Sequence, residues 1–534
     1  MSNTLYYGDN LHVLREHVRD GSVDLIYLDP PFNSNANYNI LFKSPEGQDS
    51  DAQIEAFEDT WHWNDTAETA FDEVMKSGNT AAFELLRAMR AFLGENDMMA
   101  YLAMMAVRLI ELHRVLKPTG SLYLHCDPTA SHYLKLLLDG VFGARQFRNE
   151  IVWERTNSHN MKTAAFTRSN DVILFYTKSD NYRFNTIYTD YGPEQMKRFK
   201  VDETGRLYKA ENLTFSSANK NRQFEWRGTK PPENRSWGAS LEQLEQWWSE
   251  GRILKKKDGS PRMDGLKIYL EETKGKPVGT NWTDINRVGN TSGERLGYPT
   301  QKPLALLERI IAASSNEGDV VLDPFCGCGT AVHAAQKLGR QWIGIDVTHL
   351  AISLIEKRMK DAFPGIQFTV EGRPQDLAAA MDLAERDKYQ FQWWAVSLVD
   401  ALPFGGKKKG ADGGIDGLIY FKPDGKRTEK AIVSVKGGKH VDVKMIRDLH
   451  SAMEREKAPF GVFICAALPT GPMEKEAAAV GVWENEYTGR THPRLQILTL
   501  AELFAGKRPD IPWVDASVLK AAKREDQSKQ GKLL

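Results

Sequence analysis

One segment of the chain, residues 319–346, constrains the fold more than any other. It opens with an apolar run that predicts a buried strand, and Gly327 and Gly329 follow this run. The next stretch, 330–338, has the pattern of a helix, and a second apolar run ends in Asp346. A strand, a glycine turn, a helix and a second strand in this order predict a parallel βαβ unit.

The same segment has features of a site for an adenosine-containing cofactor. Gly327 and Gly329 let the backbone approach a ligand closely, and a helix that begins at Thr330 offers unpaired N–H groups. Asp346 can accept both hydroxyl groups of a ribose, as acids at this place do in dinucleotide-binding folds. The spacing differs from G-x-G-x-x-G, so no pyrophosphate loop is predicted. The alternative is a βαβ turn without a ligand.

A second motif, Asp29-Pro30-Pro31-Phe32, follows the apolar run 24–28. Two successive prolines fix the chain just beyond the carboxyl end of a strand, where sites form in α/β sheets. The exocyclic amine of a nucleobase is a poor nucleophile because its lone pair is delocalised into the ring. The Asp29 carboxylate and the Pro30 carbonyl can accept its hydrogens, and Phe32 can stack on a base drawn out of a duplex.

Composition and length indicate a folded protein of several domains. The chain has 534 residues, of which 41% are hydrophobic and 26% charged, with a net charge of −1. No apolar run approaches the roughly 20 residues of a membrane span, and the first residues lack the pattern of a signal peptide. We therefore expect a cytoplasmic protein without a membrane partner. We expect reduced thiols at the four scattered cysteines, Cys126, Cys326, Cys328 and Cys465.

Charge is unevenly distributed along the chain. Residues 151–297 contain 25 Lys and Arg against 19 Asp and Glu, while the rest contains 45 against 52. Aromatic side chains alternate with basic and amide groups at 219–227, and Lys255-Lys256-Lys257 follow. These features predict an insertion that faces a polyanion, and the alternative is a solvated, irregular domain.

The flanks of this insertion alternate strands and helices. Before it, we expect strands at 4–7, 23–28 and 121–125 and a helix at 98–116; after it, helices at 304–314, 330–338 and 350–360 and strands at 319–322 and 341–345. The two α/β pieces can therefore form one domain around a parallel sheet.

Together these motifs resemble the β group of DNA amino-methyltransferases, the DNA methylase N-4/N-6 family, in which the catalytic motif precedes the S-adenosylmethionine motif. The resemblance covers most of residues 1–385. It rests on Gly8-Asp9-Asn10, D-P-P-F at 29–32, Arg114-Val115-Leu116-Lys117-Pro118-Thr119-Gly120, Tyr298-Pro299-Thr300-Gln301-Lys302-Pro303, and D-P-F-C-G-C-G-T at 323–330.

The resemblance implies a doubly wound, Rossmann-like methyltransferase fold that uses S-adenosylmethionine and needs no metal for methyl transfer. It implies that Asp323, Pro324, Phe325, Gly327, Gly329 and Thr330 line the methionine side of the cofactor, that Asp346 holds its ribose and Asp9 lies near its adenine, and that Thr300, Gln301 and Lys302 close over it. It implies double-stranded DNA as the partner. Asp29 resembles the adenine-N6 enzymes, and cytosine-N4 methylation is the alternative. The sequence does not decide the oligomeric state, and a homodimer is compatible with it.

The segment after 385 adds a further domain. Asp416, near one expected strand (417–421), and Lys436, after the next (431–435), resemble the motif of the Mrr-type restriction endonuclease fold, in which carboxylates bind Mg²⁺. A third strand is expected at 460–465. Ser434 stands where the family has Glu or Gln.

Three acids could replace the missing carboxylate: Asp400, Asp412 and Glu429. A combined restriction and modification enzyme is therefore one alternative. A module that only binds DNA, through Lys407–Lys409, Lys436 and Lys439, is another. A third is a DNA-binding sensor of the cofactor, which the intact D-P-P-F motif argues against.

The expected organisation has five segments. They are a catalytic half at 1–150, a target-recognition insertion at 151–297, a cofactor-binding half at 298–385, an α/β restriction-endonuclease-like domain at 390–515 and a polar tail at 516–534.

Overall fold

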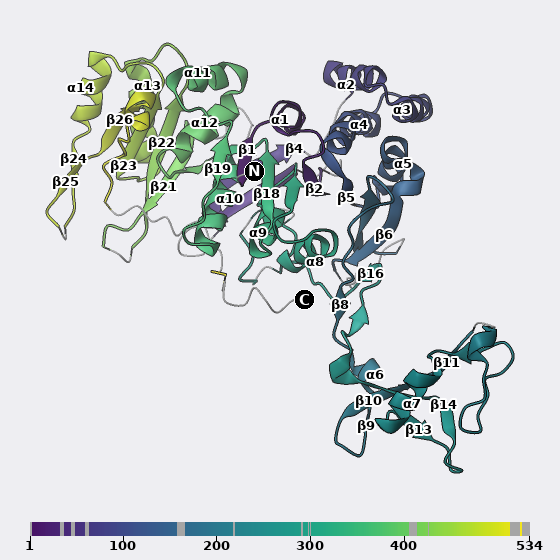
Figure 1. The fold of residues 1–534 in the computed structure, drawn as a ribbon. Coiled ribbons are helices and arrows are strands. Elements are labelled where there is room, and N and C mark those ends of the chain that lie inside the picture. Colours follow the sequence, from purple (N-terminus) through teal and green to yellow (C-terminus); the bar gives the residue numbers. More distant parts are fainter. Residues whose placement is uncertain are drawn as a thin grey trace. The chain divides into compact units, whose positions relative to one another are not determined.

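The structure is a computed structural model. It describes residues 3–31, 37–43, 49–58, 63–156, 166–216, 219–289, 292–296, 298, 301–404, 414–424, 427–486, 488–512 and 524–525, with the backbone alone for 37–58. The chain forms two compact units. One comprises Met1–Asn185 with Thr280–Leu534, and the other Thr186–Gly279 (Figure 1).

The first unit is built on a nine-stranded sheet with the order β16-β6-β7-β5-β2-β17-β18-β1-β19. β7 is antiparallel to β5 and β6, and every other neighbouring pair is parallel. The strands are β1 (Thr4–Tyr7), β2 (Val23–Leu28), β5 (Leu116–Cys126), β6 (Phe147–Glu154), β7 (Asn170–Thr177), β16 (Asn281–Trp282), β17 (Val320–Asp323), β18 (Gln341–Asp346) and β19 (Thr369–Glu371).

The strand order reverses between β2 and β17. From β17 the chain continues to β18 on one side, and from β2 it continues to β5 on the other. Leu25 pairs with Val321 and Ile26 with Leu322, so the two sequence motifs leave the sheet side by side. Ligands of open α/β sheets bind at such a switch point. The parallel register thus brings together segments almost 300 residues apart.

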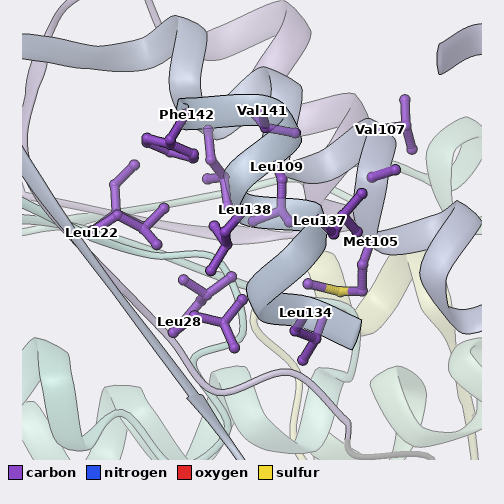
Figure 2. Packing of buried hydrophobic residues seen from close by; sticks show 14 of the residues in the cluster. Leu28, Met105, Val107, Leu109, Leu122, Leu134, Leu137, Leu138, Val141 and Phe142 are labelled. Atoms are coloured by element: carbon purple, nitrogen blue, oxygen red, sulfur yellow. The ribbon is translucent and has the colours of Figure 1, made fainter. Parts of the chain in front are cut away.

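Helices cover both faces of this sheet (Figure 1). On one face lie α1 (Asn10–His17), α2 (Asp65–Lys76), α3 (Thr80–Leu93), α4 (Asp97–Val115) and α5 (Ser131–Phe142), and on the other lie α8 (Leu304–Ser314), α9 (Thr330–Lys337) and α10 (His349–Ala362). Figure 2 shows Leu134, Leu137 and Leu138 of α5 packed with Leu109 of α4 and Leu28 of β2. β3 (Asn37–Lys43) and β4 (Asp49–Glu58) form a separate antiparallel pair.

The second unit, Thr186–Gly279, has its own small core. Its four-stranded sheet contains β9 (Lys200–Val201), β10 (Leu207–Glu211), β13 (Ile253–Lys255) and β14 (Pro261–Tyr269). It also contains β8 (Tyr188–Thr189), β11 (Thr214–Phe215), β12 (Ser236–Trp237), β15 (Lys276–Pro277), α6 (Pro193–Met196) and α7 (Leu241–Ser249). Trp226 and Trp237 pack edge to face in the core. This unit is narrower than the expected insertion, because β6 and β7 belong to the large sheet.

The C-terminal part lies in the first compact unit and has a five-stranded sheet, β20-β21-β22-β23-β26. These strands are β20 (Leu402–Pro403), β21 (Gly417–Phe421), β22 (Glu429–Lys436), β23 (Phe460–Cys465) and β26 (Leu495–Thr499). The remaining elements are α11 (Leu377–Arg386), α12 (Lys388–Ser397), α13 (Val443–Arg455), α14 (Gly471–Ala479), α15 (Leu500–Phe504), β24 (Val482–Glu484) and β25 (Thr491–Pro493).

All four cysteines are buried and carry free thiols. Within the described ranges, no helix combines the length and the apolar character needed to cross a membrane.

Candidate active site

A cavity of about 370 Å³ lies at the carboxyl ends of the central strands, at the switch point. It gathers most of the residues that the sequence motifs singled out: Asp9, Asp29, Pro30, Pro31, Gln301, Lys302, Asp323, Pro324, Phe325, Gly327, Thr330 and Asp346. Phe32 and Thr300 lie outside the described residues. The cavity is also lined by residues that the sequence analysis did not assign: Asn10, Tyr27, Met104, Arg108, Tyr298 and Leu307.

The two glycines of the turn have different environments. Gly327 lines the cavity with φ 52°, and a Cβ atom there would lie 3.2 Å from the Tyr298 ring. Gly329 has φ 74° and does not line the cavity, because its Cα faces α10, where a Cβ atom would lie 2.8 Å from Ile355. The contact of Gly329 with a ligand stays a prediction. Gly329 permits close packing of α9 against α10.

Asp346 is the acceptor around which the turn is organised. Its Oδ2 accepts a hydrogen bond from the Gly327 N–H at 2.8 Å, and its Oδ1 accepts from the N–H and the hydroxyl of Thr348, both at 2.8 Å. Burial raises the pKa of Asp346 above its ordinary value, although these hydrogen bonds oppose the rise. The carboxyl group is thus held rigidly at the edge of the cavity.

A polar cluster joins Asp9 and Asn10, at the start of α1, to the glycine turn that follows β17. Asp9 caps α1 through Oδ1, which accepts from the N–H groups of Leu11 and His12, and its Oδ2 pairs with Arg108 at 2.8 Å. Arg108 Nε donates to the Asn10 side chain at 2.6 Å, and Asn10 donates to the Pro324 carbonyl at 2.8 Å.

Arg108 could have been singled out from the sequence. It interrupts the apolar stretch of α4, where a buried cation needs a partner.

Two further carboxyl groups lie deeper in the cavity. Asp29 Oδ2 accepts a hydrogen bond from the Lys302 ammonium at 2.5 Å. Asp323 is 4% exposed, and burial raises its pKa well above the ordinary value, with Asp29 and Asp346 adding to the rise. A cation placed beside Asp323 would therefore be strongly favoured.

The C-terminal sheet brings Asp416, Ser434 and Lys436 together. Asp416 Oδ2 accepts from the Val435 N–H at 2.7 Å and from the Ser434 hydroxyl at 3.3 Å. Lys436 Nζ lies 3.7 Å from the same carboxylate oxygen. The residues of the endonuclease-like motif are thus neighbours, and Ser434 occupies the place between the acid and the lysine.

The strand register separates two of the three candidate acids from this group. Glu429 pairs with Phe421, at the opposite end of β21 from Asp416. Asp400 stands two residues before Leu402, which pairs with Leu418, so it also lies toward that end. Asp412 is outside the described residues. No cluster of three or more His, Cys, Asp or Glu side chains that could hold a metal ion occurs in the part of the chain that is described.

Two family models match the chain. A DNA methylase family matches residues 23–357, and a restriction endonuclease family matches residues 383–483. The first match spans both motifs of the cavity, and the second spans Asp416 and Lys436.

Individual relatives share part of the chain. Type II methyltransferase M.EcaI of Enterobacter cloacae is 34% identical over 261 residues, which are 48% of this chain and 57% of that protein. The Mod subunit of the type III restriction-modification enzyme StyLTI of Salmonella typhimurium is 26% identical over 64% of this chain and 50% of its own length. DNA adenine methyltransferase YhdJ of Escherichia coli is 40% identical over 20% of this chain and 37% of its own. The chain thus spans about half the length of the first two relatives.

Proposed function

Because the chain belongs to the DNA methylase family, we propose that it transfers a methyl group from S-adenosylmethionine to the exocyclic amine of a base in double-stranded DNA. One observation carries this proposal: Asp29-Pro30-Pro31 and the Asp323–Asp346 turn, which come from distant parts of the chain, line one cavity at the switch point of the sheet. An acceptor for an amine and a cradle for a nucleoside thus lie together.

The cavity residues fit this cofactor. Asp346 lies at the cavity and would accept the ribose hydroxyls, and the backbone at Gly327 leaves the space that a side chain would fill. The buried carboxyl group of Asp323 would be ionised beside the ammonium of the methionine part, which would offset the cost of its burial. Bound there, S-adenosylmethionine would supply a methyl group on a sulfonium, from which a neutral thioether is a good leaving group.

The chain's own residues would prepare the acceptor nitrogen. Asp29 and the Pro30 carbonyl accept the amine hydrogens and turn the nitrogen lone pair toward the methyl carbon. On gaining the methyl group, the nitrogen would give up one proton, for which Asp29 is an acceptor. No metal takes part in this step.

We propose adenine N6 as the target amine. The acid at position 29 and the similarity to a relative named as a DNA adenine methyltransferase support this choice. Cytosine N4 is the alternative, since both amines present the same hydrogens to Asp29.

The unit Thr186–Gly279 is proposed to recognise the DNA sequence. It has 18 Lys and Arg against 14 Asp and Glu. Arg227 and Lys255 both lie 4.7 Å from the centre of the Trp248 ring. Replacing Lys255, Lys256 and Lys257 by alanine should weaken DNA binding and reduce its dependence on salt concentration, because fewer phosphate contacts release fewer counterions.

The central experiment combines wild-type protein, plasmid DNA, S-adenosylmethionine and long-read sequencing that detects methylated bases. We expect N6-methyladenine at one short sequence. Asp29→Ala should abolish methylation and leave the dissociation constant for S-adenosylmethionine within a few fold. A large loss of cofactor binding in this variant, or methylation that survives it, would contradict the assignment of Asp29.

The C-terminal domain supports a second candidate function, DNA cleavage with Mg²⁺. Asp416, directly before β21, and Lys436, at the end of β22, lie 3.7 Å apart, and a restriction endonuclease family matches this region. Asp416 would hold the ion and Lys436 would steady the phosphate. Incubation of unmethylated plasmid with Mg²⁺ tests this function, and fragments that disappear with Asp416→Ala would establish it. A homodimer and a cytoplasmic location are further proposals, which sedimentation and cell fractionation would test.

A further inference from the structure

The ammonium of Lys302 lies on the acceptor that the proposed reaction needs. Its Nζ is 2.5 Å from Oδ2 of Asp29, and the two side chains are 9% and 17% exposed. The residues are 273 positions apart and come from separate motifs. An N–H donor therefore already contacts the carboxylate to which the amine of the target base has to donate.

The charges around the cavity explain why a cation lies there. Among its described lining residues, four are aspartates, and the cations are Arg108 and Lys302. Arg108 binds Asp9 and Asn10, at 2.8 Å and 2.6 Å. Lys302 is thus the cation closest to the inner carboxyl groups, and it offsets the negative charge of Asp29.

We propose that Lys302 is a positioning residue that holds the Asp29 carboxylate before the base enters, and that the exocyclic amine of the base then displaces its ammonium from this oxygen. This inference rests on the proposed function. Both groups are N–H donors to the same carboxylate. The lysine side chain is a flexible chain that ends in an ammonium with three N–H donors. The ammonium can therefore leave Asp29 while the backbone stays in place.

A second carboxylate lies within electrostatic range of the displaced ammonium. Asp171 is 2% exposed, and its pKa is lowered: burial would raise it, but the hydrogen bond from His125 and the charges of His125, Lys302 and Arg155 outweigh burial. Movement of Lys302 toward Asp171 would keep the cation paired, so displacement need not leave a buried charge alone.

This exchange makes a specific prediction about the base. In the wild-type protein, the new hydrogen bond from the amine replaces the bond from Lys302, so the amine adds little to affinity. Without the ammonium, the amine donates to a carboxylate oxygen that has lost its donor, so the amine adds more to the affinity. The preference for adenine over purine, which is adenine without its amine, should therefore depend on Lys302.

The experiment measures dissociation constants of the full chain, without cofactor, for two duplexes that carry adenine or purine at the mapped target position. Fluorescence anisotropy gives the ratio of the two constants. In Lys302→Met, this ratio should shift about tenfold toward adenine relative to wild type, the size expected for a hydrogen bond to a charged group. Lys302→Arg keeps a cationic donor and should keep the ratio within about twofold.

Lys117→Met is the matched control, because it breaks a similar pair, with Asp24 at 2.7 Å, outside the cavity lining. It should leave the ratio unchanged. If Lys302→Met fails to fold by its melting curve, Lys302→Leu, which also has no N–H donor in its side chain, carries the same test. An unchanged ratio in a folded variant would overturn the inference, even with normal wild-type methylation. A wild-type protein that methylates no DNA would instead overturn the proposed function.

Discussion

The hydroxyl of Tyr27 on β2 lies 2.9 Å from Nδ1 of His125 on the neighbouring strand β5, and this contact is buried. Nε2 of the same ring lies 3.1 Å from Asp171, which also pairs with Arg155 at 3.3 Å. A carboxylate only accepts hydrogen bonds, so Nε2 carries a proton and donates to Asp171. In the tautomer whose one proton is on Nε2, Nδ1 accepts a hydrogen bond from the Tyr27 hydroxyl. Burial raises the pKa of Tyr27 well above its ordinary value, in keeping with a donor. In this tautomer, the Tyr27 hydroxyl donates to the ring of His125 and not toward the cavity that Tyr27 lines.

Asp171→Asn should slow methylation because an amide can donate to Nε2 and reverse the tautomer. The Tyr27 hydroxyl then loses its acceptor and is free to donate toward the cavity, on the face of β2 that also carries Asp29. We expect a fall of about tenfold in kcat with little change in the affinity for S-adenosylmethionine. Single-turnover methylation and calorimetric titration measure the two quantities.

Asp139→Asn is the control for this substitution. Asp139 accepts from the Tyr176 hydroxyl at 2.6 Å, in a comparable pair away from the cavity. Similar losses of kcat in both variants would show that the effect is one of stability alone.

Asp346→Asn should impair cofactor binding rather than chemistry. The carboxylate accepts from two backbone N–H groups and a hydroxyl, whereas an amide presents an NH₂ group to one of these donors. The dissociation constant for S-adenosylmethionine should rise at least about tenfold. Asp361→Asn, which alters a pair with Lys357 on α10, should leave it unchanged. Unaltered cofactor affinity in Asp346→Asn would contradict the ribose assignment.

Two buried histidines should make the protein sensitive to acid. Burial lowers the pKa of His333 to about 4 and that of His349 to about 3, and Arg358 and Arg373, respectively, add to these effects. Glu525 opposes the shift at His333. Both rings stay neutral in the folded chain while the unfolded chain takes up protons below about pH 6.5.

This difference in proton uptake decides how the free energy of unfolding changes with pH. The unfolded state binds more protons between pH 6.5 and the folded pKa values, so the free energy of unfolding falls as the pH falls through this range. Each histidine should lower the free energy of unfolding at pH 5 by about 2 kcal/mol relative to pH 7.5. Urea unfolding at the two pH values measures the loss, and His349→Gln should reduce it. Equal losses in the variant and the wild type would contradict this account.

Much of the fold follows from local patterns. The strands around D-P-P-F and the glycine turn lie where their apolar runs predict them, since both motifs follow short, buried strands. The meeting of the two motifs could be expected from the rules for parallel sheets.

Long-range pairings could not be predicted in the same way. The contact of Lys302 with Asp29 depends on how a loop folds back over 273 residues. The sequence predicts Gly329 at the ligand because it is a glycine of the turn and because of the family resemblance, whereas the packing of Ile355 against it is seen only in the structure. Likewise, the separation of Glu429 from Asp416 depends on the register of β21 and β22.

The C-terminal part packs directly on the wall of the cavity. Trp393 of α12 and Leu402 of β20 share a buried cluster with Tyr298 and Cys328, both of which line the cavity. The Tyr7 hydroxyl donates to the Gln390 side chain at 3.2 Å. Buried contacts therefore cross the boundary near residue 390.

Trp393→Ala should weaken the binding of S-adenosylmethionine, although Trp393 does not line the cavity. Loss of a buried tryptophan costs about 3–5 kcal/mol, and here the void would lie behind Tyr298 and Cys328. Trp483→Ala is the control, because Trp483 is partly buried and packs on Phe421 and Phe460 of the C-terminal core. We expect both variants to melt at lower temperature, but only Trp393→Ala to raise the dissociation constant for the cofactor severalfold. A chain that ends at residue 387 and binds the cofactor with wild-type affinity would show that the cavity keeps its shape without the C-terminal part.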